Sequence, residues 1–269
     1  MHKLSKIFLL SMLSFFFILG NAIAGPFGTD ITIYDNRSSG TGWYGTQEDQ
    51  EVEPGMQTSQ QWDLEAFAIQ GSTLTIISGY NFLRDDWNFG DIFIDVDGDA
   101  KYGIAAPPTS TPTDTNKFGY DYVIDLDLQQ DSQTLAYSVY QLDSASVLNM
   151  VYPAWNHPES SPYSYNSGGT LVTGAGGDIS FLGYPTPLTD AQVGGYAGGS
   201  HYTLSVDIGW LFDPAKAPDY DDFFLAKTTM YCGNDNLIGA IPEPATMLLL
   251  GSGLIGIAAI GRKRFLKEM

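Results

Sequence analysis

A run of aspartates between residues 91 and 99 is the strongest candidate for chemistry in this sequence. Asp95, Asp97 and Asp99 alternate with other residues, so in an extended strand their carboxylates lie on one face. Carboxylates this close repel one another unless a cation lies between them, and Ca²⁺ accepts such oxygen ligands in flexible geometry. A second acidic segment, residues 119–127, supplies Asp121 as a further ligand. The pattern predicts a calcium site made of these four aspartates.

Two other interpretations bear on this site. An EF-hand loop is excluded, because Gly98 falls at the fourth loop position and Ala106 stands where the twelfth requires glutamate. Aspartate and glycine are also ordinary turn residues, so a solvated acidic turn without a metal is the alternative.

Cys232 is the only cysteine, which excludes an intramolecular disulfide, and we expect its thiol to be buried and inert.

Short segments rich in β-branched and aromatic residues must position these aspartates. They recur between clusters of Gly, Pro, Asn, Asp and Ser, which predicts strands joined by turns. Strands are expected at residues 31–34, 62–69, 73–80, 91–96, 120–128, 134–142, 147–152, 179–184, 202–211 and 223–231. Surface loops are expected at residues 105–117, 153–169, 185–200 and 213–222. The sequence therefore predicts an all-β domain, a single antiparallel two-sheet sandwich of the jelly-roll type.

The segment 62–69 has the clearest alternation. Trp62, Leu64, Ala66 and Ala68 are expected on one face, and Asp63, Glu65, Phe67 and Ile69 on the other. Gln70-Gly71-Ser72 then turns into the next predicted strand, so the two strands are expected to form a hairpin.

The N-terminal segment has the three parts of a secretory signal peptide. Lys3 and Lys6 precede an apolar run over residues 7–19, and the small residues Ala22 and Ala24 follow. The run is shorter than the roughly 20 residues of a spanning helix. We expect a signal peptide over residues 1–24, cleaved after Ala24, with an uncleaved anchor helix as the alternative.

The C-terminal segment has the composition of a membrane span. Residues 245–261 carry no charge and, with their neighbours, are about long enough to cross a bilayer as a helix. The basic cluster Arg262-Lys263-Arg264 follows and would stay on the cytoplasmic side. The pattern predicts one transmembrane helix that leaves the domain at residues 25–241 outside the membrane.

Residues 242–269 resemble the PEP-CTERM sorting signal of Gram-negative bacteria that make exopolysaccharide. The matching parts are Pro242-Glu243-Pro244, the apolar helix with its glycines, and Arg262-Lys263-Arg264. The resemblance implies that exosortase, a membrane cysteine transpeptidase-like enzyme, recognises and removes this tail. It also implies sorting to the outer surface or extracellular matrix, with membrane contact only through the C-terminal helix before processing.

Motifs inside the domain resemble a group of PEP-CTERM proteins. They are Trp62-Asp63-Leu64-Glu65-Ala66, the two aspartate segments, and Thr229-Met230-Tyr231-Cys232-Gly233-Asn234-Asp235. The aspartate-rich strand pair is also similar to DOMON domains and carbohydrate-binding modules. Those are β-sandwiches that bind sugar or haem, and the similarity implies fold rather than function.

Charge limits the partners of the domain. The two tails hold six of the 12 basic and two of the 31 acidic residues, so residues 25–241 keep 6 basic and 29 acidic residues, a formal charge of −23. Such a charge repels nucleic acid and anionic lipid and argues against both as partners.

Trp155, in an expected loop, is the candidate for stacking on a sugar. We therefore predict a non-catalytic envelope protein associated with exopolysaccharide; the alternatives are a calcium-supported carbohydrate-binding module and a secreted glycoside hydrolase.

Overall fold

The computed structural model describes residues 24–33, 48–83, 88–101, 112–128, 135–151 and 160–241. The described part is mostly β and contains one short α-helix, α2 (Asp190–Val193), with the 3-10 turns η1 (Gln60–Trp62) and η3 (Gly209–Phe212). The all-β expectation is thereby confirmed. Ala22, Trp155 and the tail from Pro242 onward, with Glu243, Pro244, Arg262, Lys263 and Arg264, lie outside the described residues. Within those ranges no helix is long and apolar enough to span a membrane.

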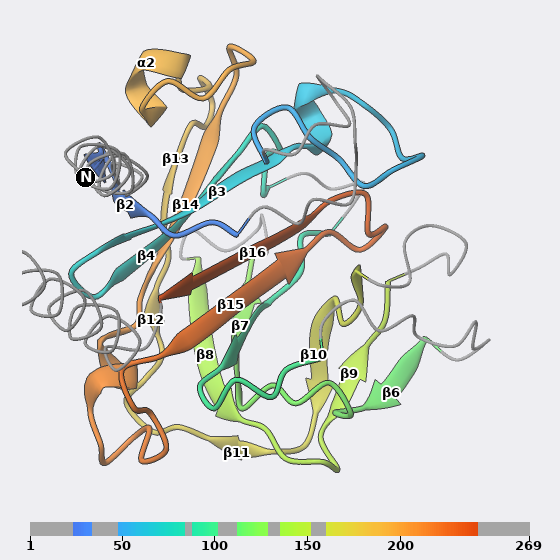
Figure 1. Ribbon diagram of the computed structural model, residues 1–269, viewed down its shortest axis with the longest axis vertical. Helices are drawn as coiled ribbons and strands as arrows, with labels where there is room; N and C mark the ends of the chain where they lie inside the picture. The colour runs from blue at the N-terminus through green and yellow to red at the C-terminus, as the bar shows by residue number, and fades with distance from the viewer. Residues whose placement is uncertain are drawn as a thin grey trace, which may run out of the picture.

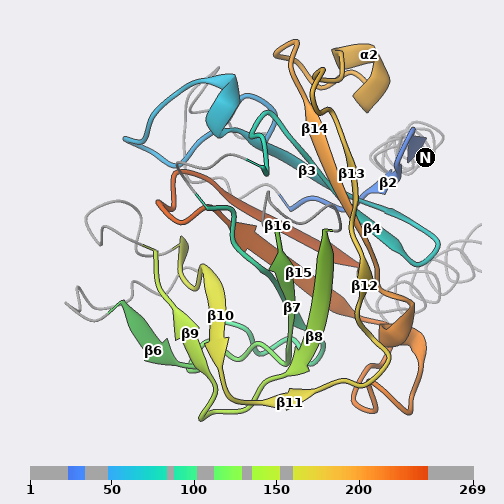
Figure 2. The same ribbon diagram turned by 180° about the vertical axis from the view of Figure 1, so that it is seen from behind.

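The strands form three antiparallel sheets (Figures 1 and 2). Sheet I runs in the order β1 (Ala24–Gly25), β2 (Gly28–Asp30), β3 (Leu64–Gln70), β4 (Thr73–Ser78), β14 (Tyr202–Asp207) and β13 (Ser180–Leu182). Sheet II runs in the order β11 (Thr170–Leu171), β8 (Ala136–Gln141), β7 (Tyr122–Asp127), β5 (Ile92–Asp95), β15 (Phe224–Thr229) and β16 (Asn236–Ile241), and β12 (Gly177–Asp178) also pairs with β8. Sheet III is β10 (Ser164–Ser167), β9 (Val147–Asn149) and β6 (Thr113–Thr115).

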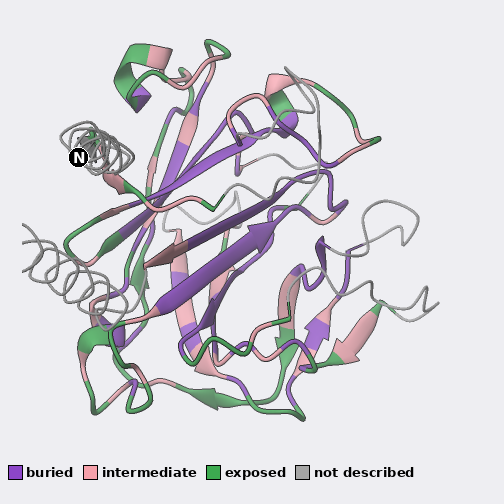
Figure 3. Cartoon of the chain, in the orientation of Figure 1, coloured by how far each residue is buried: buried purple, intermediate pink, exposed green. Residues whose placement is uncertain are grey.

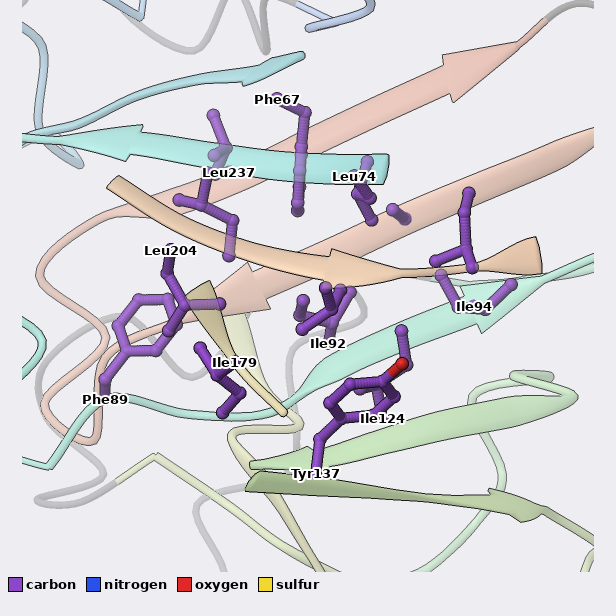
Figure 4. Close-up of a cluster of buried hydrophobic side chains, with 14 of the residues drawn as sticks. Phe67, Leu74, Phe89, Ile92, Ile94, Ile124, Tyr137, Ile179, Leu204 and Leu237 are labelled. Atoms are coloured by element: carbon purple, nitrogen blue, oxygen red, sulfur yellow. The ribbon is translucent and has the colours of Figure 1, made fainter. Parts of the chain in front are cut away.

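Sheets I and II enclose the main hydrophobic core. Alternate residues of their strands point into it, including Phe67 and Leu204 from sheet I and Ile92, Ile94 and Ile124 from sheet II (Figure 4). All five of these side chains are completely buried. Burial of this apolar surface is the main favourable term in folding, so the two large sheets are held together as a sandwich.

The central strands β5, β7 and β15 of sheet II are buried on their other face as well (Figure 3). Phe93, Val123 and Leu225 point away from the main core into a second cluster, where they meet Leu148 of sheet III. A strand covered on both sides reads as a continuous apolar run, as Ile92-Phe93-Ile94 does. The single two-sheet jelly roll is therefore not confirmed, since the described strands make three sheets and the third covers the second.

The predicted hairpin is confirmed, but its first strand does not keep the predicted faces. Strands β3 and β4 pair from Gln70 opposite Thr73, and the register shifts between Leu64 and Ala66. This β-bulge places one extra residue, Glu65, in β3, so the alternation changes phase there. Leu64 therefore shares the main core with Phe67. Ala66 and Ala68 instead face the opposite side of the sheet, under Val193 of α2.

Several other expectations were wrong in detail. Strands β6 and β10 and helix α2 fall inside segments where only loops were expected. The strand expected over residues 202–211 ends at Asp207 and is followed by η3. Strand β16 was not predicted. Ala24 is the first residue of β1, and the cleavage expected after it stays a prediction.

A buried lysine attaches the segment before β10 to sheet II. Lys227 of β15 is completely buried, and its Nζ donates hydrogen bonds to the carbonyl oxygens of Ser160 and Pro162. Hydrogen bonds from a charged donor are stronger than those between neutral groups. The lysine therefore holds the segment that leads into sheet III against the second core.

Replacing this lysine by an apolar residue of similar length tests that role. Lys227→Met leaves the two buried carbonyl oxygens without their donor, so we expect a loss of about 2 to 4 kcal/mol in the free energy of unfolding. Denaturant unfolding followed by circular dichroism measures it. Lys117→Met is the control, because Lys117 is 39% exposed and pairs with Asp114 at the surface. Its change is expected to stay within about 0.5 kcal/mol, and an equal loss in both variants would contradict the assignment.

Candidate metal sites

The aspartate turn predicted from the sequence follows strand β5. Asp95, the last residue of that strand, accepts hydrogen bonds at Oδ1 from the amides of Asp97 (3.1 Å) and Gly98 (2.9 Å). Its Oδ2 accepts one from the amide of Ala100 at 3.1 Å. Gly98 has φ +77°, in the left-handed region that glycine adopts at little cost. The carboxylate of Asp95 therefore organises the turn through backbone amides.

The structure brings three of the four predicted ligands together. Asp95, Asp97 and Asp121 each offer a carboxylate oxygen, and these oxygens lie within 4.8 Å of one another. Asp121 reaches the turn from the residue before β7, where its Oδ2 accepts a hydrogen bond from the amide of Val96 at 2.8 Å. Asp99 is not in the group; its carboxylate lies against Gly119, where a Cβ would stand 2.3 Å from Asp99 Oδ1.

Repulsion between these carboxylates shows in their proton affinities. Burial and the neighbouring charges of Asp97, Asp95 and Asp99 raise the pKa of Asp121 to about 6. Burial also raises the pKa of Asp95, against the opposing effect of its three backbone hydrogen bonds. Asp97 is exposed, so the group opens to solvent on one side. A cation placed among these oxygens would remove the repulsion.

Asp91, the first aspartate of the same run, has a different environment. Its side chain is buried, with Oδ1 accepting a hydrogen bond from the amide of Leu126 (2.9 Å) and Oδ2 one from the amide of Tyr165 (2.6 Å). Burial, and then the charge of Asp125, raise its pKa to about 8. Asp91 therefore joins β5 to the neighbouring strands β7 and β10 and is not a member of the metal group.

A second group of carboxylates lies inside the fold, and the sequence did not predict it. We call it the interior acidic cluster. Its members are Glu48, Asp49, Glu51, Asp63, Glu65 and Asp235. They form two triads whose ligand oxygens lie within 4.8 Å of one another: Glu48 with Glu51 and Asp235, and Asp49 with Asp63 and Glu65. All except Asp49 are buried.

Three separate parts of the chain supply these side chains. The segment before η1 carries the first three acids, and its Glu53 amide donates a 3.0 Å hydrogen bond to the carbonyl of Asn234. Asp63 follows η1, and Glu65 is the bulged residue of β3. Asp235 precedes β16, and its Oδ2 accepts a hydrogen bond from the amide of Leu64 at 2.6 Å. In Figure 1 this segment before η1 lies beside the turn that joins β15 to β16.

The charges of the cluster act on one another. Burial is the largest cause that raises the pKa of Asp63 well above its usual value, and the charge of Glu65 adds to it. Burial, followed by the charges of Glu51 and Asp63, raises the pKa of Asp235 in the same direction. The two triads therefore form one electrostatic unit.

His201 is the basic side chain that touches this unit among the described residues. Its ring is buried, with Nδ1 2.8 and 2.9 Å from the two carboxylate oxygens of Glu65 and Nε2 2.9 Å from Oδ1 of Asp190. Burial lowers the pKa of His201, but these two carboxylates outweigh burial and raise the pKa above its ordinary value. The imidazolium form can donate one hydrogen bond to each acid.

The two carboxylate oxygens of Asp63 differ in their hydrogen bonding. Oδ2 of Asp63 accepts a hydrogen bond from the amide of Gln50 at 2.9 Å, whereas the buried Oδ1 has no hydrogen-bond partner in the described part of the chain. The sequence did hold a signal for this site. Asp63 and Glu65 were placed on the same strand face as Phe67 and Ile69, and charged residues on an apolar face require a partner.

Comparison with known proteins identifies one segment of the chain. Residues 240–264 match the PEP-CTERM protein-sorting motif. No curated protein and no solved structure matches the chain. The match confirms the sorting signal predicted at Pro242-Glu243-Pro244 and the residues that follow. It indicates exosortase-dependent sorting to the cell surface of a bacterium, with exosortase as the processing partner.

The buried carboxyl of Asp91 gives a test in the pH dependence of stability. The folded protein holds this proton up to about pH 8, whereas the unfolded chain releases it near 3.8. The contribution of this protonated carboxyl to the free energy of unfolding is complete below about pH 4 and is lost as the pH rises through about 8. The total loss is on the order of 5 kcal/mol. Asp91→Asn stays neutral throughout, so its stability relative to wild type should rise steadily between these two limits.

Urea unfolding at a series of pH values measures this difference. Asn offers one acceptor oxygen where Asp91 accepts two amides, so the variant also carries a constant cost that does not depend on pH. Asp178→Asn, at an exposed residue of β12, is the control and should follow wild type. A constant offset between Asp91→Asn and wild type would disprove the assignment.

Proposed function

We propose that this protein is a non-catalytic component of the bacterial cell surface that associates with extracellular polysaccharide. The observation that carries the proposal is the PEP-CTERM sorting motif at residues 240–264. This signal delivers the chain to the outside, where its β domain then acts by binding. The acidic balance of residues 25–241 supports a neutral or cation-bridged glycan as the ligand, since nucleic acid and anionic lipid would be repelled.

Two reactive side chains that the structure describes, His201 and Cys232, are enclosed, which supports a role without catalysis. His201 is buried with both ring nitrogens directed at carboxylates, and Cys232 is 6% exposed. A nucleophile or a general base must reach the substrate that it acts on. Neither of these side chains is accessible to a substrate in solution.

Calcium at the aspartate turn would connect the domain to its ligand. Asp95, Asp97 and Asp121 present an all-oxygen group suited to Ca²⁺. The exposed residues Asp97, Gly98 and Asp99 leave one side of that group open. Hydroxyl or carboxylate oxygens of a polysaccharide could complete the coordination of an ion there. The same ion would hold the turn between β5 and β7 in place.

The sorting step is tested in an exosortase-producing bacterium. We expect the wild-type chain to be shortened and recovered from the cell surface. A variant with Pro242→Ala, Glu243→Ala and Pro244→Ala should stay at full length in the membrane fraction, because the recognition motif is lost. Immunoblots of the fractions measure both. A variant with Pro218→Ala and Asp219→Ala, in an exposed loop, is the control. Normal shortening of the tail variant would refute the sorting step.

The calcium step is tested by titration calorimetry on the EDTA-treated full-length chain. Asp97→Asn removes one ligand charge from an exposed position, so it should lower the affinity of the turn for calcium at least roughly tenfold. Mutation of a residue that only hydrogen-bonds to a metal ligand already causes a loss of that size. Asp221→Asn, an exposed acid outside the group, is the control and should leave binding unchanged. Identical titrations of wild type and Asp97→Asn would exclude calcium at the turn.

The polysaccharide step needs a separate measurement. Binding to immobilised exopolysaccharide should be strong in calcium, weak in EDTA, and reduced by Asp97→Asn. If binding to the polysaccharide persists in EDTA, the domain binds the glycan without calcium at the aspartate turn, and Ca²⁺ has no part in recognition. If the protein shows no glycan binding in either condition, polysaccharide association is wrong, while the sorting step stands.

A further inference from the structure

The triad Asp49, Asp63 and Glu65 within the interior acidic cluster has the features of a second cation site. Its three ligand oxygens lie within 4.8 Å of one another. Asp63 is completely buried, and its Oδ1 has no hydrogen-bond partner in the described part of the chain. A buried carboxylate oxygen without a partner is costly, because it has lost water and gained nothing in exchange. This oxygen therefore calls for a partner that the described part of the chain does not supply.

Charge balance indicates what that ligand is. Three carboxylates of the triad face one imidazolium, His201, among the described side chains, and that ring is shared with Asp190. A single positive charge leaves about two negative charges uncompensated when the acids are ionised. A divalent cation would balance them, and buried charges in proteins are usually paired or coordinate metals.

The chemistry of the donors favours a hard cation over zinc. All three donors are carboxylate oxygens, which suit calcium and magnesium, whereas zinc sites are built mainly from cysteine and histidine. His201 is turned away from a ligand role, since Nδ1 lies against Glu65 and Nε2 against Asp190. Magnesium demands near-ideal octahedral geometry and keeps several waters, which a buried triad on irregular backbone does not favour.

We propose that Asp49, Asp63 and Glu65 bind a Ca²⁺ ion inside the fold, with Asp63 as the central ligand. The ligands are themselves oriented, as carboxylates at metal sites are. Asp49 accepts the amide of Ala197 at 3.0 and 3.1 Å, and Glu65 accepts the side-chain amide of Gln60 at 2.6 Å. The site is separate from the aspartate turn and does not depend on polysaccharide binding.

Such an ion would connect parts of the chain that no strand pairing joins. Asp49 belongs to the segment before η1, Asp63 and Glu65 flank the start of β3, and Ala197 lies in the connection between α2 and β14. The bulge at Glu65 is what places this side chain in the cluster instead of leaving it paired in the hairpin. The ion would therefore fix one end of sheet I against the segments that cover it.

The test uses the EDTA-treated full-length chain with calcium chloride as the only probe. Asp97→Asn first removes the aspartate turn, and the calcium that still binds is measured by titration calorimetry. Adding Asp63→Asn to this background should weaken the remaining binding at least tenfold. Asp91→Asn, at a buried aspartate outside both groups, is the matched control and should leave it unchanged. If Asp63→Asn leaves the remaining affinity as it was, or if no calcium binds once the turn is removed, the proposal is wrong.

Thermal melting separates a ligand from a structural acid. The amide introduced by Asp63→Asn would keep an oxygen for the Gln50 amide and place its NH₂ where Oδ1 has no partner. In EDTA the variant should therefore melt at the same or a higher temperature than its parent, because a repelling charge is removed. In calcium it should lose the rise in melting temperature. An equal fall in both conditions would show a purely structural role and overturn the proposal.

A second variant keeps the proposal testable if Asp63→Asn does not fold. Glu65→Gln removes another ligand charge. Terbium is added in place of calcium, and its emission is measured while Trp62, the residue before Asp63, absorbs the exciting light. Terbium emission that calcium displaces, and that Glu65→Gln abolishes in the Asp97→Asn background, supports the interior site. Emission that Glu65→Gln leaves unchanged overturns it.

Discussion

The close approach of β3 to β16 is the constraint on which the sandwich depends. The segment after β2 lies between them, where the amide of Ile31 donates to the carbonyl of Phe67 and the amide of Ala240 donates to the carbonyl of Ile31, both at 2.9 Å. Gly239 permits this, because a Cβ at that position would stand 2.9 Å from Cβ of Phe67. Sheets I and II are therefore joined by backbone hydrogen bonds at this edge and by apolar packing in between.

The interior acidic cluster lies at the same junction. Two motifs singled out in the sequence, Trp62-Asp63-Leu64-Glu65-Ala66 and the segment that ends at Asp235, meet there through the hydrogen bond from the Leu64 amide to the Asp235 carboxylate. Backbone amides at this junction, such as those of Leu64 and Gln50, donate hydrogen bonds to buried carboxylates. These carboxylates bring negative charge into the interior. The polar interior is thus a consequence of how the two sheets are joined, and not a defect of the core.

The sequence could reveal features whose residues are contiguous. The β3–β4 hairpin and the central strand β5 have clear alternation or continuous apolar runs, and the aspartate turn lies mostly within one segment, so all three were found. Strand β9 of sheet III lies within a predicted strand, but β6 and β10 are three and four residues long and polar, with no period to detect. The interior acidic cluster joins residues from Glu48 to Asp235, and a bulge that residue propensities do not predict directs Glu65 into it. Such a site depends on tertiary contacts, which one sequence does not display.

The aspartate turn and the interior acidic cluster differ in their exposure to solvent. A bound cation would therefore have a different role at each site. At the aspartate turn, backbone amides already satisfy Asp95, and exposed Asp97 leaves the group open, so an ion there can exchange ligands with a partner molecule. In the interior cluster Asp63 and Glu65 are enclosed and Asp49 is half-buried, so an ion there would be surrounded mainly by protein. Low local polarity strengthens every charge interaction in the second place. On our proposals, recognition therefore belongs to the turn, and cohesion of the fold belongs to the interior.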